Sequence, residues 1–223
     1  MDAQTLQDTL RDIKTQFRMG MNGMASKSMR DKGLDYKMNF GVEIPRLKQI
    51  ATLYPKDHQL AQALWKENIR ESKILAAMLQ PVDSFYPEIA DIWVEDMHQP
   101  EIAEQTCQQL FQHLPYASQK AFEWIADGRE YFEACGYLIL ARLFTRSAEL
   151  SDRSEAEYLD QVAASLQSDS PFVRRCAYAS LIKFVQRSEA EGKKALQALA
   201  ALKHSDKPEM KAIYEQIEQE VKG

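Results

Sequence analysis

The sequence predicts an all-α protein, a solenoid of stacked helix pairs that presents one concave groove. Three observations support this fold class. A helical pattern occurs twice, 41 residues apart, since Cys135 in the first copy aligns with Cys176 in the second. Repeats of about 40 to 47 residues are typical of paired-helix solenoids. The 223 residues include only eight Gly and eight Pro, mostly between periodic segments, and no convincing period-two alternation indicates a sheet.

The repeated pattern is clearest in two segments, REYFEACGYLILARLF (129–144) and SPFVRRCAYASLIKFVQR (170–187). A weaker similarity lies upstream, where WKENIRE has the Trp, Arg and Glu spacing of WIADGRE. Solenoids of this kind usually bind their partners on the concave surface. The sequence therefore directs the search for function to the helices that line one groove.

Apolar periodicity predicts the helices in order along the chain. They cover residues 2–18, 27–33, 45–54, 57–67, 70–79, 84–97, 99–113, 116–126, 129–145, 154–167, 170–186, 189–203 and 207–221. The Gly-, Met- and Ser-rich residues 19–28 are interpreted as a hinge or loop. Pro45 suits the first turn of its helix, and Asp169 or Ser170 can cap the helix that Pro171 begins. We expect one domain over 1–223, with 1–26 as an N-terminal helix and loop and 191–223 as C-terminal helices.

Composition points to a cytoplasmic protein. No apolar run approaches the length needed to span a membrane, and the N-terminus lacks the apolar segment of a secretory signal. The three Cys lie within separate helical patterns and are expected to be buried thiols, and the four His have no ligand-like spacing. We therefore expect no metal and no cofactor. The three Trp are expected at core positions, and the methionines between 19 and 38 suggest adaptable packing.

Charge is unevenly distributed along the chain. The net charge is −5, yet residues 171–187 contain Arg174, Arg175, Lys183 and Arg187 and no acid. Residues 83–104 are the reverse, with seven acids and no Lys or Arg. Such unevenness can attract a polyanion locally, although ordinary solvated helix faces would give the same pattern.

Helical periodicity predicts which side chains face the groove. In 170–187 the apolar core stripe is Val173, Cys176, Ala177, Ser180, Leu181 and Phe184. The opposite face has Arg175, Ala179, Ile182 and Gln186, and the opposite face of the earlier copy has Ala134, Leu138 and Ala141. Two apolar residues at matching positions, Leu138 and Ile182, suggest either a ligand groove or contact with a neighbouring element. Arginines and lysines beside that face are able to hold phosphates without reading sequence.

Several segments together resemble the DNA alkylation repair family of HEAT-like repeat proteins, the AlkD-like glycosylases. They are GVEIPRLKQIA (41–51), LWKENIRESKILAAML (64–79), WVEDM (93–97), EQTCQQL (104–110), EWIADGREYFEACGYLIL (123–140) and FVRRCAYASLIKF (172–184). The resemblance covers roughly residues 27–190. It implies a HEAT-like solenoid whose concave, positively lined surface holds duplex DNA and which excises cationic alkylated purines. A carboxylate would stabilise the oxocarbenium-like sugar, with aromatic faces beside it.

The family's functional residues match poorly when they are carried over one at a time. In the family's Trp-Asp-x-x-Asp pattern, Glu104 stands in place of the aromatic residue and Gln108 in place of the catalytic carboxylate. The groove arginine falls on Ala134 and the second groove tryptophan on Ala179. Because an amide is not an ionised acid and alanine has no π-face, we expect base excision to be lost or strongly altered. Glu104, one helical turn from Gln108, is the weak candidate for a replacement carboxylate.

Three hypotheses follow from this comparison. The first is a non-catalytic protein that binds the backbone of double-stranded DNA; its candidate contacts are Arg174, Arg175, Lys183, Arg187, Arg129, Arg142, Lys32 and Lys37. The second is a divergent glycosylase that uses Glu104. The third is a protein-interaction scaffold, suggested by the net negative charge and by Leu138 and Ile182.

Overall fold

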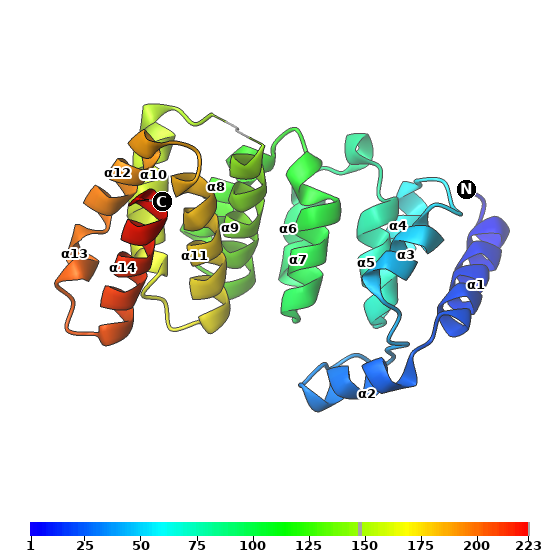
Figure 1. Ribbon diagram of the computed structural model, residues 1–223. Coiled ribbons are helices and arrows are strands. Elements are labelled where there is room, and N and C mark those ends of the chain that lie inside the picture. The colour runs from blue at the N-terminus through cyan, green and yellow to red at the C-terminus, as the bar shows by residue number, and fades with distance from the viewer. Residues whose placement is uncertain (147–148, 223) are drawn as a thin grey trace. The chain divides into compact units, whose positions relative to one another are not determined.

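The structure describes residues 1–146 and 149–222 of a computed structural model, and these residues form helices joined by turns and loops (Figure 1). Within them the only strand-like pairing is an isolated bridge between Met38 and Ile69. The α-helices are α1 (Ala3–Met19), α2 (Gly23–Asp31), α3 (Ile44–Ala51), α4 (His58–Trp65), α5 (Arg70–Leu79), α6 (Pro87–Glu95), α7 (Pro100–Gln109), α8 (Ala117–Asp127), α9 (Glu130–Thr145), α10 (Asp152–Ser165), α11 (Pro171–Val185), α12 (Glu189–Ala198), α13 (Ala200–Lys203) and α14 (Pro208–Lys222). The all-α prediction is confirmed.

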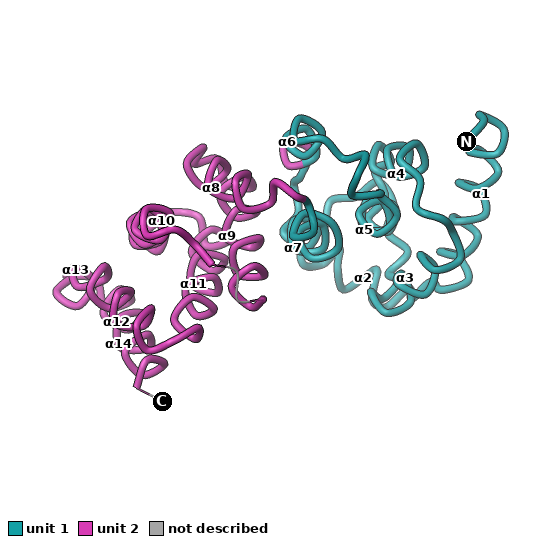
Figure 2. Tube along the Cα trace, turned by 90° about the horizontal axis from the view of Figure 1, so that it is seen from above, with its two compact units in different colours: residues 1–93, 97–114 teal, residues 94–96, 115–223 magenta. Residues whose placement is uncertain are grey.

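The helices form two compact units, coloured separately in Figure 2. Unit 1 comprises Met1–Trp93 and Met97–Leu114, and unit 2 comprises Val94–Asp96 and Pro115–Gly223. Each unit has its own core. The expectation of a single domain over 1–223 stays a prediction.

Unit 1 packs helices α1, α3, α4, α5 and α7 around a core rich in aromatic rings. The α4 and α5 helices pack side by side, and α5 also contacts α3 and α7. At the end of α4, Trp65 stacks on Trp93 with ring centres 3.9 Å apart, and Phe85 meets Trp93 edge-on. All three tryptophans of the chain are buried, including Trp124 of unit 2, so their predicted core positions are confirmed.

A buried charge cluster fixes the segment between α2 and α3. The guanidinium of Arg70 donates to both carboxylate oxygens of Glu101, at 2.7 and 2.6 Å, and to the carbonyl of Val42 at 2.8 Å. Its neighbour Glu71 accepts from the backbone N–H groups of Phe40 and Val42, at 3.1 and 3.2 Å. Burial alone would lower the pKa of Arg70, but Glu101 and Glu71 outweigh it and raise that pKa above its ordinary value. The cluster therefore keeps Arg70 charged while it holds residues 40–42 onto α5.

Unit 2 has two layers of helices. One layer contains α9, α11 and α14, and the other contains α8, α10 and α12. Between α9 and α10, the hydroxyl of Tyr137 lies 2.7 Å from that of Ser165, which donates to the carboxylate of Glu133. Burial raises the pKa of Glu133, and the hydrogen bond from Ser165 offsets only part of that rise.

The predicted core stripe of α11 is confirmed, and the predicted opposite face of α9 is confirmed only in part. Every stripe residue of α11, from Val173 to Phe184, is buried. The placement of Ala134 on an exposed groove face is wrong, because its side chain is fully buried. The reason is that α9 packs against both α8 and α11, so it is covered on more than one side. The other two residues predicted on this face, Leu138 and Ala141, are partly exposed, in agreement with the prediction.

The largest difference in the helix boundaries concerns residues 19–28, which were expected to form a hinge or loop. Helix α2 already begins at Gly23, because the side chain of Asn22 accepts from the N–H of Ala25 and caps it. The helix ends at Asp31, and Gly33 follows with a φ of 93°. The predicted helix at 189–203 is divided into α12 and α13 at Leu199.

Candidate nucleic-acid interface

A hollow of unit 2 with a cationic lining lies where α11 and α14 both begin. It has a volume of about 580 Å³. Its charged lining residues are Arg174, Arg175, Lys207, Asp169 and Glu209, and its other lining residues include Gln167, Ser168, Tyr178, Met210, Ile213 and Gln216. The cations exceed the acids by one, and the N-terminal ends of two helices add positive potential. An anion of phosphate size is the ligand that such a hollow suits.

Local structure holds the cations of this hollow in place. Ser170 caps α11 by accepting from the N–H of Val173, and Pro171 occupies the first turn. Arg174 is half-buried and donates to the carbonyls of Ser168 and Asp169, at 2.6 and 3.1 Å. Arg175, one position further, is exposed, with its guanidinium 5.4 Å from the ring centre of Phe172. The pair therefore has one half-buried arginine anchored on backbone carbonyls and one exposed arginine beside an aromatic ring.

Two residues of the hollow were missed in the sequence. Lys207 lies in the turn before Pro208, where the sequence indicated only a helix boundary. Tyr178 is partly buried, and burial together with the negative charge of Glu220 raises its pKa. The signal for Lys207 was its position just ahead of a helix N-terminus, where a cation opposes the helix dipole instead of complementing it.

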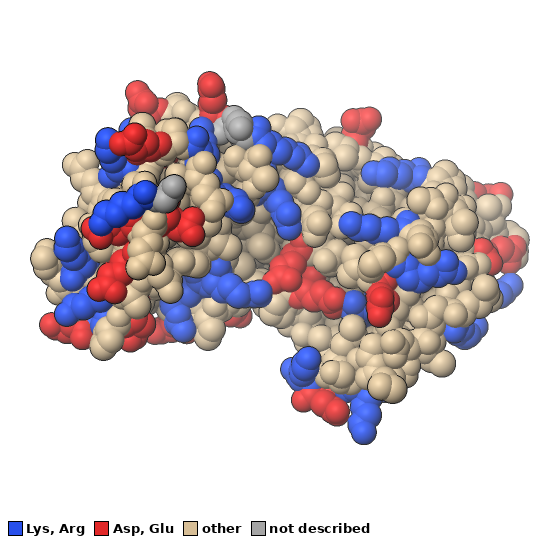
Figure 3. Space-filling view, viewed as in Figure 1, with Lys and Arg blue, Asp and Glu red and all other residues tan. Residues whose placement is uncertain are grey.

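The outer face of α9 and α11 continues the basic character. Arg142, Arg175 and Lys183 are exposed there, and Ala179 lies exposed between them. Ile182 and Leu138 are partly exposed. In the view of Figure 3, acidic side chains lie between the lysines and arginines. The positive charges on this face therefore do not form one large area of positive electrostatic potential.

Two of the predicted DNA contacts are already engaged within the protein. Arg187 is mostly buried, with its guanidinium 5.5 and 5.7 Å from the rings of Phe144 and Phe184 and 4.0 Å from Glu191. Arg129 is exposed, but it pairs with Asp127 and Glu95 and lies 3.8 Å from the ring centre of Phe132. The hydrogen bond to Asp127 is the main cause of its raised pKa. These contacts favour structural roles for both arginines.

The remaining predicted residues are divided between the units. Lys32 and Lys37 are exposed in unit 1, next to α2. Glu104 and Gln108 also belong to unit 1, half-buried on one face of α7, while Ala134 and Ala179 belong to unit 2. The amide of Gln112 donates to the backbone carbonyl of Gln108, so the backbone at this position is engaged. Among the described residues, no group of three or more His, Cys, Asp or Glu side chains is placed to hold a metal ion.

Comparison with known proteins places the chain among relatives of DNA repair enzymes. The model of the family "DNA alkylation repair enzyme" matches residues 13–213, a wider span than the resemblance at 27–190. A solved structure matches with a TM-score of 0.75 at 15% identity, over 85% of this chain and 81% of that one. It is described as belonging to a new family of proteins related to the HEAT-like repeat DNA glycosylases with affinity for branched DNA structures. The HEAT-like repeat fold is confirmed, and no curated protein matches the sequence significantly.

Proposed function

Because the chain belongs to the DNA alkylation repair enzyme family, we propose that it binds DNA through backbone contacts and that its base-excision activity is lost or strongly altered. The observation that carries the proposal is the family match over residues 13–213. The hollow formed by Arg174, Arg175 and Lys207 supports it with cations arranged to hold phosphates. The affinity for branched DNA described for the solved neighbour's family supports including branched as well as linear duplexes.

Helix α7 lacks a carboxylate at the position where the family's excision chemistry needs one. A glycosidic bond breaks through a cationic sugar, which a nearby carboxylate stabilises. Gln108 stands where the family's carboxylate is expected, and its amide has no negative charge. The exposed residue at the second tryptophan position, Ala179, provides no π-face.

Low-salt binding of a fluorescein-labelled linear duplex, followed by anisotropy, tests the proposal. Affinity is expected to fall steeply with salt, because phosphate contacts release counterions. The double variant Arg175→Ala/Lys207→Ala removes two exposed cations of the hollow and leaves the Arg174 contacts in place. We expect it to reduce affinity about tenfold and to lower the slope of log K against log salt by about 1 to 2.

The matched control removes two exposed cations from the other layer of unit 2. Arg153 of α10 and Lys193 of α12 are both exposed, so Arg153→Ala/Lys193→Ala changes net charge by the same amount. This control is expected to change the affinity less than twofold. No binding by the wild-type protein at low salt, or equal losses in the two double variants, would contradict the proposed interface.

A divergent glycosylase is the second candidate function. The favouring observation is Glu104, a carboxylate one helical turn from Gln108 on the same face of α7. It predicts release of a modified base from alkylated DNA, with release abolished in Glu104→Gln.

A protein-interaction scaffold is favoured instead if the outer face of α9 and α11 proves electronegative and DNA fails to bind. A cytoplasmic location stays a prediction; among the described residues no helix is long and apolar enough to cross a membrane.

A further inference from the structure

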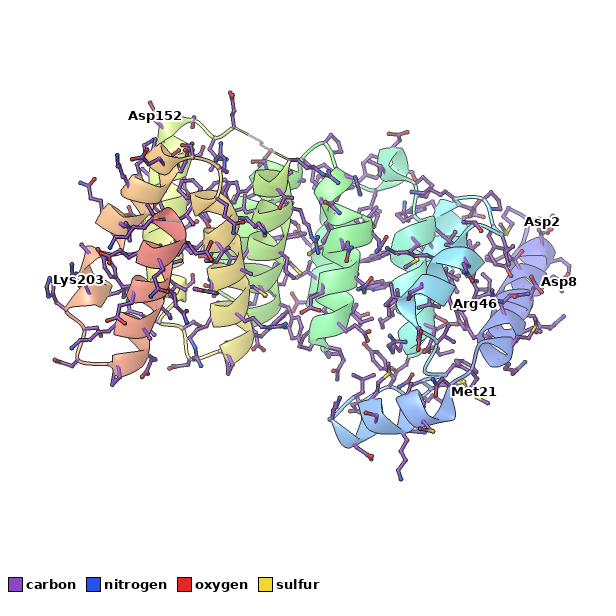
Figure 4. The ribbon with its side chains drawn as sticks, in the orientation of Figure 1. Asp2, Asp8, Met21, Arg46, Asp152 and Lys203 are labelled. Atoms are coloured by element: carbon purple, nitrogen blue, oxygen red, sulfur yellow. The ribbon has the colours of Figure 1, made fainter. Side chains whose placement is uncertain are left out.

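The turn between α1 and α2 exposes an apolar surface that the DNA-backbone proposal does not use. Met19, Met21 and Met24 are 69, 62 and 86% exposed and together form what is called here the methionine patch. They line a hollow of about 720 Å³ whose other lining residues are Gly20, Asn22, Gly23, Gly41, Glu43 and Arg46. Figure 4 labels Met21 at this turn and Arg46 on α3. A cluster of large exposed apolar side chains around a hollow is typical of a binding surface.

The backbone beneath the methionine patch is firmly anchored. The N–H of Asn22 donates to the carbonyl of Phe40 at 3.0 Å, and the hydroxyl of Ser26 donates to the carbonyl of Asn39 at 2.7 Å. Gly41 has a φ of 70°, and a Cβ there would lie 2.3 Å from the carbonyl oxygen of Asn22. Gly41 therefore allows the backbone of residues 40–42 to pack directly against the start of α2. Glu71 in turn holds residues 40–42 through its hydrogen bonds to Phe40 and Val42. The patch is presented by a braced turn, so binding it costs little ordering of the backbone.

The chain segment that contains the methionine patch is basic, although the whole chain is acidic. Residues 18–48 contain seven cations, Arg18, Lys27, Arg30, Lys32, Lys37, Arg46 and Lys48, against three acids, Asp31, Asp35 and Glu43. Lys27 is exposed one turn after Met24 on α2. A partner that fits must combine negative charge with an accessible apolar surface.

We propose that the methionine patch contacts the exposed faces of nucleobases at a branch, gap or end of DNA, while Arg46 and other cations of the same chain segment hold the adjacent phosphates. Linear duplex DNA hides its base faces by stacking, whereas a branch point exposes them. Methionine thioethers make favourable contacts with aromatic rings, and apolar side chains are commonly inserted between base steps. The inference rests on the proposed DNA binding and names the kind of DNA that unit 1 selects. An anionic membrane surface is less suitable because the methionine patch contains none of the Trp, Phe or Leu side chains with which interfacial helices enter a bilayer.

The test compares a three-way junction with a linear duplex of the same number of base pairs, both fluorescein-labelled and measured by anisotropy. The wild-type protein is expected to prefer the junction. The variant Met19→Ala/Met21→Ala/Met24→Ala is expected to reduce junction affinity about tenfold and to change linear-duplex affinity less than twofold. Met→Gln at the same three positions retains chain length and removes only the apolar character, so it is expected to behave alike.

The matched control replaces three other exposed apolar residues of unit 1. Leu53, Tyr86 and Ile92 are 60, 63 and 64% exposed, and Leu53→Ala/Tyr86→Ala/Ile92→Ala should leave the junction preference unchanged. Binding of neither DNA would overturn the proposed function and this inference with it. Duplex binding without a junction preference, or a preference that survives the methionine variants, would overturn the inference alone. So would methionine-dependent binding to phosphatidylserine vesicles in place of the junction.

Discussion

The two units contain one sequence pattern, WKENIRE in unit 1 and WIADGRE in unit 2, and use its final Arg–Glu pair in opposite ways. Arg70 and Glu71 are 1 and 0% exposed in their side chains, and they fasten residues 40–42 to α5. The side chain of Arg129 is 52% exposed and pairs with Asp127 and Glu95. Glu130 accepts from the hydroxyl of Ser170, which caps α11.

The difference comes from what covers the pair. In unit 1, the backbone N–H of Arg70 donates to the carbonyl of Met38, so the segment before α3 lies directly over it. In unit 2, the N–H of Arg129 donates to the side chain of Asp127, only two residues away. The same residues therefore become a buried fastening or a surface ion pair according to whether a distant segment folds over them.

The largest expected effect comes from removing the buried arginine. Arg70→Ala leaves Glu71 buried without its cation and deprives Glu101 of a bidentate partner. We expect a loss of about 3–5 kcal/mol in the free energy of unfolding, measured by urea denaturation. Arg129→Ala removes an exposed pair and should shift the denaturation midpoint by a small fraction of that change. Similar shifts for the two variants would contradict the contrast between the units.

A second expected effect concerns how closely the paired helices approach. A Cβ on Gly136 of α9 would lie 2.6 Å from the carbonyl oxygen of Ala121 in α8. The position that aligns with it in α5 is Ala77, which is fully buried, so α4 and α5 already accommodate a methyl group. Gly136→Ala is expected to destabilise the protein by about 1–3 kcal/mol through overpacking.

Its counterpart, Ala77→Gly, should cost only about 1 kcal/mol, because glycine lowers helix propensity without causing a clash. Thermal denaturation of both variants checks the difference. A stabilised Gly136→Ala protein would show that α8 and α9 can separate at no cost.

The two glutamates of the repeated pattern, Glu71 and Glu130, should also differ in how much they stabilise the fold, with the larger contribution from the buried Glu71. Glu71→Gln weakens the acceptor for two buried N–H groups and is expected to cost about 1–3 kcal/mol. Amide hydrogen exchange at Phe40 and Val42 should accelerate in this variant and remain unchanged in Glu130→Gln. Unchanged protection of both amides in Glu71→Gln would show that another group holds the segment.

The smallest expected effect concerns Glu133 and the pH. Burial raises the pKa of Glu133, so the folded state favours the protonated carboxyl group. Relative to the protonated form, the folded protein therefore loses stability as the pH rises through the folded-state pKa and the carboxylate forms. Glu133→Gln is neutral at every pH and retains an acceptor for Ser165. The variant should melt above the wild type at pH 7, and the difference should shrink as the pH falls toward 4.5. A difference that grows on acidification would mean that the carboxylate is stabilising.

The fold was predictable from the sequence where a helix has a single apolar face and that face determines which residues are buried. The stripe of α11 from Val173 to Phe184 was read correctly because one side of that helix carries nearly all its large apolar residues. Ala134 was misplaced because a helix packed on several sides buries residues beyond its main stripe. The start of α2 was missed because Gly and Ser suggested a loop, although Asn22 was an available capping signal.

The candidate interface was predictable only in part. Arg174 and Arg175 were visible as adjacent cations beside an apolar stripe. Lys207 joins them only through the packing of α14 against α11, although it lies 32 residues after Arg175 in the chain. The charge cluster around Arg70 was hidden for the same reason, since Glu101 lies 31 residues further along the chain.

That separation has a consequence for biosynthesis. The chain leaves the ribosome from its N-terminus, and residues 1–79 contain every helix from α1 to α5 before the codon for Glu101 is read. Until that carboxylate emerges, the guanidinium of Arg70 lacks its bidentate partner, and the segment that supports α2 is only partly secured. A nascent chain halted before residue 101 is therefore expected to remain protease-sensitive near residue 40, and one extended past α7 to become resistant.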